Sequence, residues 1–259
     1  MNPIVARQMI GAEFLKLRKK RGLVGWALLL AAGSVVIYLG VKAMQHGSNP
    51  FERPPAGGER GFERTLELLG FFMVPLAAIL IGAEAGAGDR ANGVFRDLVV
   101  TGRSRVALFL VRLPGALMLT FVVVGVAFLL AVGGVFLFAG GDPTPSLALV
   151  AKAAAWSALA NGVVCIVAVG LASLIGSRPA TITALVGWQL VASPMLLQSG
   201  SLGRAREVLL DGAFSQIKPG LRGGEPVLGM SIAAVVISIV LWIVIASAVG
   251  AWRTATEDA

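Results

Sequence analysis

Few side chains in this sequence are suited to covalent or metal chemistry. The chain has a single histidine, His46, and a single cysteine, Cys165, among its 259 residues. An intrachain disulfide is therefore impossible, and neither a zinc cluster nor an HExxH metal site can be assembled. A Ser-His-Asp or Cys-His mechanism would depend on His46 alone. The sequence does not favour an enzyme with its own catalytic centre.

Residues 84–105 hold the densest group of side chains that can recognise a partner. The segment begins with an acid and contains several glycines, which predict a break in the helix there. A short helix follows, with Phe95 and Leu98 on its apolar side. Arg96 and Asp97 lie on its exposed side. Such a helix, lying along the membrane, is suited to docking into a groove on a soluble protein, although the pattern fits an ordinary solvated loop equally well.

Uncharged polar side chains inside apolar stretches are candidates for a substrate path, because polar groups are costly in lipid. Asn161 and Gln189 are the deepest of these, and Trp188 is a candidate to line the same path. Hydrogen bonds between helices explain the two amides as well, and lipid-facing packing explains Trp188; we favour these interpretations. The sequence shows no buried pair of opposite charges, although a proton-coupled carrier would be expected to have one.

The elements that position these residues are membrane-spanning helices. Hydrophobic residues make up 56% of the chain and charged residues only 14%, whereas a soluble domain carries about a quarter charged residues. A helix needs about 20 apolar residues to cross the hydrocarbon core. The sequence therefore predicts an all-α integral membrane protein with six spans, at 23–44, 66–83, 106–138, 147–175, 180–197 and 230–252.

Residues 1–22 predict an amphipathic helix at the membrane interface, ahead of a six-helix domain over 23–259. Glu13 and Lys20 intrude on the apolar side of this helix. The basic cluster before the first span places the N-terminus in the cytoplasm, and six spans return the C-terminus to the same side. Residues 84–105 are then cytoplasmic, and residues 198–229 are external.

The formal net charge of +8 has a membrane explanation. The basic residues form short clusters at the ends of apolar runs rather than a basic face interleaved with aromatic side chains. We therefore expect no binding to nucleic acid and expect the lipid bilayer as the environment of the chain.

The segment after the second span resembles a known family. An acid at the end of that span, a glycine before a short helix, and Ser-Arg opening the third span are similar to the ABC-2 type permeases, the membrane subunits of ATP-binding-cassette exporters. The matching positions are Glu84, Gly93, Ser104 and Arg105. The family commonly has Thr or Arg beside the glycine and Pro before Ser-Arg, whereas this chain has Val94 and residues 101–103 there, so the resemblance assigns no subfamily.

The resemblance implies a role for each part of the chain in a transporter driven by a separate ATPase. The N-terminal helix would be an elbow helix on the inner leaflet of a bacterial-type cytoplasmic membrane. Residues 84–105 would couple to a separate nucleotide-binding subunit that binds ATP and Mg²⁺, because this chain has no GxxxxGK[ST] loop and would not hydrolyse ATP by itself. A second permease, identical or homologous, would complete the transporter. The residues assigned to coupling are Glu84, Gly93, Phe95, Arg96, Asp97, Leu98 and Arg105.

Two other classes of protein remain open. A secondary carrier would show an internal repeat and acids within the membrane, and a membrane-embedded enzyme would show a constellation of catalytic groups at one depth. Neither pattern is visible in the sequence. The resemblance makes an exporter the leading expectation, and the mostly uncharged interior of the spans favours a hydrophobic or amphipathic substrate.

Overall fold

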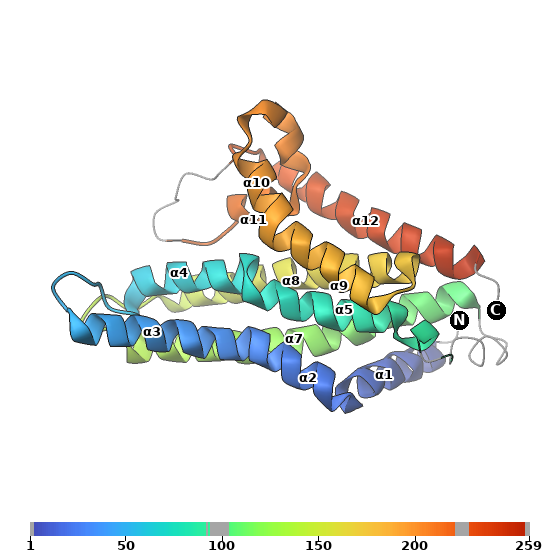
Figure 1. Cartoon of the computed structure of the whole chain (residues 1–259), viewed down its shortest axis with the longest axis horizontal. Coiled ribbons are helices and arrows are strands. Elements are labelled where there is room, and N and C mark those ends of the chain that lie inside the picture. The colour runs from blue at the N-terminus through green and yellow to red at the C-terminus, as the bar shows by residue number, and fades with distance from the viewer. Residues whose placement is uncertain (1–2, 92, 94–103, 221–227, 257–259) are drawn as a thin grey trace.

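The computed structural model describes residues 3–91, 93, 104–220 and 228–256, and these form helices and connecting turns without strands (Figure 1). Within these residues, six helical segments are long and apolar enough to cross a membrane: Arg21–Ser48, Gly58–Ala91, Arg105–Leu137, Leu147–Ile175, Arg178–Gln198 and Ile232–Thr256. The all-α, six-span prediction is confirmed. Both ends of the chain lie at the same end of the bundle, which we call the terminal end (Figure 1).

The N-terminal helix predicted from the sequence is present as α1 (Pro3–Lys19). Lys20 is not helical, with φ −76° and ψ 81°, so the chain turns there into the first span. That span consists of α2 (Arg21–Leu28), a π-helical stretch η1 (Leu29–Gly33) and α3 (Ser34–Ser48). In Figure 1, α1 meets α2 at an angle, as an elbow does.

The second span is broken in the middle. It consists of α4 (Gly58–Phe71) and α5 (Met73–Ala91), with Phe72 outside both helices. Pro75 accounts for the position of the break, because proline has no N–H to donate to the carbonyl four residues earlier and its ring crowds that carbonyl. Carbonyl groups at the end of α4 must therefore find partners elsewhere.

The second helical segment also ends later than the sequence predicted. The glycines that follow Glu84 were expected to break the helix, and this expectation is wrong: α5 continues to Ala91. Glycines of α5 allow close packing instead, since a Cβ on Gly82 would lie 2.6 Å from the carbonyl oxygen of Cys165, and one on Gly86 would lie 2.5 Å from that of Val169. Small residues of this kind let helices approach closely in lipid.

Two long helices form the centre of the bundle. Helix α7 (Arg105–Leu137) begins at Ser104, whose hydroxyl accepts from the N–H of Ala107 at 3.2 Å. Helix α8 (Leu147–Ile175) begins in the same way at Ser146 and ends at Gly176, which has φ +72°. Hydroxyl caps and a left-handed glycine are the local signals that start and stop helices, so the predicted spans 106–138 and 147–175 agree closely with these helices.

The last part of the chain lies along one side of the other helices (Figure 1). Helix α9 (Arg178–Gly187), the π-helical stretch η2 (Trp188–Ala192) and α10 (Ser193–Gln198) form the fifth span. A 3₁₀ segment η3 (Gly200–Val208) and the short helix α11 (Leu210–Gln216) lead to α12 (Ile232–Thr256), the sixth span. Although α11 belongs to the segment predicted to be external, Ala213 and Phe214 are fully buried.

Candidate functional site

A buried ion pair joins α5 to α7 near the terminal end. The guanidinium of Arg112 lies 2.9 Å from the carboxylate of Asp89, and their side chains are 1% and 7% exposed. The expectation that the chain contains no buried pair of opposite charges is therefore wrong. Lys16 of α1 approaches the other oxygen of Asp89, also at 2.9 Å, so the N-terminal helix shares the same carboxylate.

The same cluster extends to α8 through backbone oxygens. Arg112 donates to the carbonyl of Gly86 at 3.4 Å, and the hydroxyl of Ser173 donates to this carbonyl at 3.3 Å. Arg90 donates to the carbonyl of Ser173. These contacts fix the last two turns of α5 against both long helices.

Glu84 forms a second group of ion pairs on another side of α5. Its carboxylate accepts from Lys20, the residue at the elbow, and lies 2.8 Å from Arg178 at the start of α9. Glu84 is 4% exposed. The acid assigned to coupling from the sequence thus lies inside the bundle, where it links the elbow to two spans rather than facing outward.

Helix α1 is also held by close packing against α7. A Cβ on Gly115 would lie 2.7 Å from the Cβ of Glu13, so only glycine permits this approach. Glu13 pairs with Lys16 at 2.5 Å. Both charged residues that interrupt the apolar side of the predicted N-terminal helix thus belong to this network: Lys20 pairs with Glu84, and Glu13 pairs with Lys16, which itself binds Asp89.

The remaining residues assigned to coupling lie either next to a gap in the described chain or inside it. Gly93 is exposed, has φ +71° and donates its N–H to the carbonyl of Arg90 at 3.0 Å, the left-handed geometry in which glycine often ends a helix. Arg105 opens α7 and donates to the carbonyl of Ala255 at 3.5 Å. Four residues lie outside the described part of the chain: Phe95, Arg96, Asp97 and Leu98.

The two amides proposed for a substrate path are partners of the broken second span. Asn161 is completely buried and donates to the carbonyl of Leu69 at 2.9 Å. Gln189 donates to the carbonyl of Phe71 at 3.3 Å, which is the carbonyl that Pro75 cannot serve. Both side chains thus satisfy backbone groups freed by the break, in agreement with the hydrogen-bonding interpretation.

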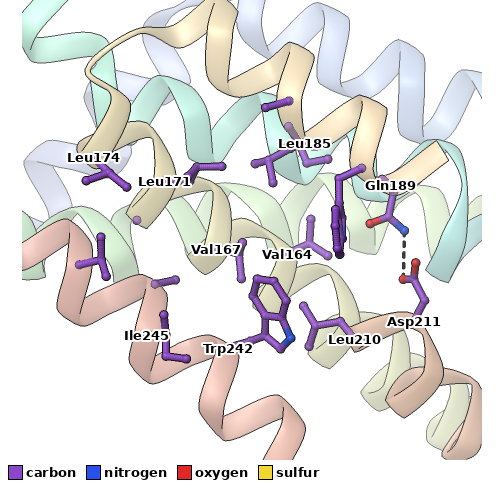
Figure 2. Close-up of a pocket in the computed structure, with 16 residues that line it drawn as sticks. Val164, Val167, Leu171, Leu174, Leu185, Gln189, Leu210, Asp211, Trp242 and Ile245 are labelled. Atoms are coloured by element: carbon purple, nitrogen blue, oxygen red, sulfur yellow. Dashed lines mark hydrogen bonds between the residues drawn. The ribbon is translucent and has the colours of Figure 1, made fainter. Parts of the chain in front are cut away.

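A cavity of about 410 Å³ lies between α8, α9 and α12, with Ile79 of α5 among its lining residues (Figure 2). Of the three residues proposed for a path, Gln189 and Trp188 line this cavity and Asn161 does not. The rings of Trp188 and Trp242 lie 6.4 Å apart, which brings η2 and α12 together. The indole N–H of Trp242 donates to the carbonyl of Val208 at 2.8 Å.

An acid that the sequence did not single out lines this cavity as well. Asp211 of α11 is 8% exposed, accepts from the amide of Gln189 at 3.1 Å and accepts from the hydroxyl of Ser193. Burial raises the pKa of the Asp211 carboxyl above its usual range, while the hydrogen bonds from Ser193 and Gln189 act in the opposite direction. The signal available in the sequence was the apolar run Val208–Leu210 directly before this acid.

No protein-family model and no curated protein matches the chain.

Proposed function

We propose that this chain is the membrane-spanning permease of an ATP-binding-cassette exporter of the ABC-2 type, driven by ATP hydrolysis on a separate nucleotide-binding subunit. The observation that carries the proposal is the network of charges at the terminal end. It ties the N-terminal helix to the last two turns of α5 and to α7, the helices that lead into and out of residues 92–104. A protein that pushes on this segment would move several helices together.

The buried pair makes this end of the bundle suitable for transmitting force. Asp89 and Arg112 are both shielded from water, and separating them would break a buried ion pair in a medium of low dielectric constant, which is costly. The three helices α1, α5 and α7 are therefore expected to move as one body. Glu84 extends this body to α9 through Arg178.

The exposed apolar surface supports the proposed surroundings. In the apolar 18-residue stretch of α12 only 17% of the residues are buried within the chain, and in that of the fifth span only 22% are buried. Lipid and a second permease, identical or homologous, would cover these faces. The proposed orientation places the terminal end in the cytoplasm of a bacterial-type cell, where the ATPase with its ATP and Mg²⁺ would dock on residues 84–105.

Copurification tests this proposal directly. The permease would be tagged and expressed with any ATP-binding-cassette ATPase that a neighbouring reading frame encodes. We expect the two chains to purify together from detergent and the ATPase activity to change on association. If no ATPase associates, the proposed function is rejected.

Variants in the docking segment make the test sharper. Phe95→Asp and Asp97→Lys reverse the character of an apolar and a charged side chain, and each should weaken assembly or ATPase stimulation. Glu52→Gln serves as the control, because Glu52 is an exposed carboxylate in the turn after α3, at the opposite end of the bundle. Undiminished coupling in both variants would remove the docking role from this segment.

A secondary carrier is a second candidate, because the structure places acids inside the bundle where the sequence showed none. Asp211 and the Asp89–Arg112 pair are the kind of buried charged groups that carriers use. Proteoliposomes separate the two functions. A carrier transports under an imposed proton or sodium gradient without ATP, whereas the proposed exporter requires both the ATPase and ATP.

A further inference from the structure

The cavity between α8, α9 and α12 has apolar walls and a carboxylate. Sixteen residues line it, and apart from the indole N–H groups the only polar side chains among them are those of Gln189 and Asp211. Figure 2 shows both projecting from different helices and joined by a hydrogen bond, with Val164, Val167 and Leu171 along the neighbouring wall. The volume of about 410 Å³ is within the range of pockets that hold one drug-sized molecule.

The partners of Asp211 do not neutralise its charge. Its carboxylate accepts one hydrogen bond from the hydroxyl of Ser193 and one from the amide of Gln189, and both donors are neutral. None of the sixteen lining residues is basic, and none of the ion pairs found among the described residues includes Asp211. This contrasts with Glu84 and Asp89, each of which is paired with two cations.

A carboxylate in such surroundings favours a cation. Moving an ionised group out of water is costly unless an opposite charge approaches it. The two indole rings add to this preference, because Trp188 and Trp242 line the same cavity and aromatic faces attract cations. The walls formed by α8 and α12 offer only apolar contact to the rest of a bound molecule.

We propose that this cavity binds a lipophilic cation, with its charged centre beside Asp211 and its apolar body along α8 and α12. Gln189 and Ser193 hold the carboxylate at the cavity wall, and Trp188 and Trp242 lie against the bound molecule. As an assignment of the transported substrate, this inference rests on the proposed transport function. Binding to the chain itself does not depend on an ATPase.

Direct binding to the purified full chain tests the site. Radiolabelled tetraphenylphosphonium is the probe, and tetraphenylborate, which has nearly the same shape but a negative charge, is the matched control ligand, measured in separate samples. We expect saturable binding of the cation and binding of the anion weaker by at least about tenfold, which corresponds to about 1.4 kcal/mol. Equal binding of the two ions, or saturable binding of neither, would overturn the proposal.

Three variants locate the binding. Asp211→Asn removes the charge with little change in shape and should weaken cation binding by about tenfold or more. Glu52→Gln removes an exposed carboxylate that does not line the cavity and should leave binding unchanged. Ala184→Trp fills the cavity from α9 and should reduce binding irrespective of charge. Cation binding that survives both Asp211→Asn and Ala184→Trp would place the ligand elsewhere.

Size-exclusion profiles of the variants separate loss of binding from loss of folding. If Asp211→Asn does not remain monodisperse, the selectivity of the unaltered chain for cation over anion and the effect of Ala184→Trp still decide the question. The copurification experiment is independent of these measurements. Cation binding without an associated ATPase would reject the exporter and retain the site.

Discussion

The guanidinium of Arg112 on α7 lies 2.9 Å from the carboxylate of Asp89 on α5, and both side chains are almost fully shielded from solvent. The two residues are 23 positions apart in the chain. Lys16 approaches the same carboxylate from the N-terminal helix, so three elements meet at one acid. This arrangement joins α1, α5 and α7 to one another at the terminal end of the bundle.

Removal of one partner from this pair should be strongly destabilising. Arg112→Gln leaves Asp89 with Lys16 as its remaining cation in a buried position, and we expect a loss of about 3–5 kcal/mol in the free energy of unfolding. Thermal unfolding in detergent measures the effect. Lys218→Gln is the control, because its ion pair with Glu67 lies at the surface and should contribute less than about 1 kcal/mol. Equal effects of the two variants would contradict a special role for the buried pair.

The close approach of α1 to α7 can be tested with one methyl group. Gly115→Ala places a Cβ 2.7 Å from that of Glu13, so α1 must shift, and we expect a loss of about 1–3 kcal/mol. Gly125→Ala, in the same helix, meets nothing within 4 Å and should be neutral or slightly stabilising, because alanine has the higher helix propensity. A melting temperature that falls equally in both variants would show that contact with α1 is not the cause.

The hydrogen bond from Gln189 to the broken second span should be coupled to Pro75. In the unaltered chain the side-chain amide of Gln189 donates to the carbonyl of Phe71, to which Pro75 cannot donate. Gln189→Ala leaves this carbonyl without the donor, at a cost of about 1–3 kcal/mol. Pro75→Ala restores an N–H that can donate to the same carbonyl. We expect Gln189→Ala to be less destabilising by about 1 kcal/mol in the Pro75→Ala background. A double-mutant cycle of unfolding free energies measures this difference, and simple additivity would argue against it.

The pH dependence of stability should reveal Asp211. Because burial raises its pKa in the folded chain, its contribution to stability is fully present at pH values below the ordinary pKa and is lost as the pH rises through the raised value. Relative to Asp211→Asn, the unaltered chain should therefore become less stable as the pH rises above about 4, until it passes the raised pKa of Asp211. Melting temperatures of both proteins across this range measure the effect. A difference that does not vary with pH, or that varies in the opposite direction, contradicts the assignment.

Local signals explain where the sequence analysis succeeded. Ser104 and Ser146 cap the long helices, Gly176 stops the second of them, and the apolar stretches between these residues have the length of a span. Each signal acts within a few residues, so it can be recognised without knowledge of the fold. The break at Phe72 had a local signal too, in Pro75, but a hydropathy window averages over such a break.

The candidate sites were predicted only in part. Gln189 and Trp188 were identified as polar and aromatic residues at depth, and both line the cavity. Asp211 was missed because it lies in a segment that follows the fifth span and contains several charged residues, which is typical of an external loop. Its burial follows from the contacts of α11 with two spans: Gln189 and Ser193 of the fifth span donate to Asp211, and Trp156 of α8 donates to the carbonyl of Phe214 at 3.0 Å.

The sequence by itself determined that this protein is all-helical and crosses a membrane six times, because the free energy of placing a segment in lipid depends mainly on its own composition and length. Only the tertiary structure decided which polar groups face one another. The contacts of Asp89 with Arg112 and of Asp211 with Gln189 depend on the rotation and depth of helices relative to one another. Packing of the whole bundle sets these two quantities, and no short stretch of sequence contains them.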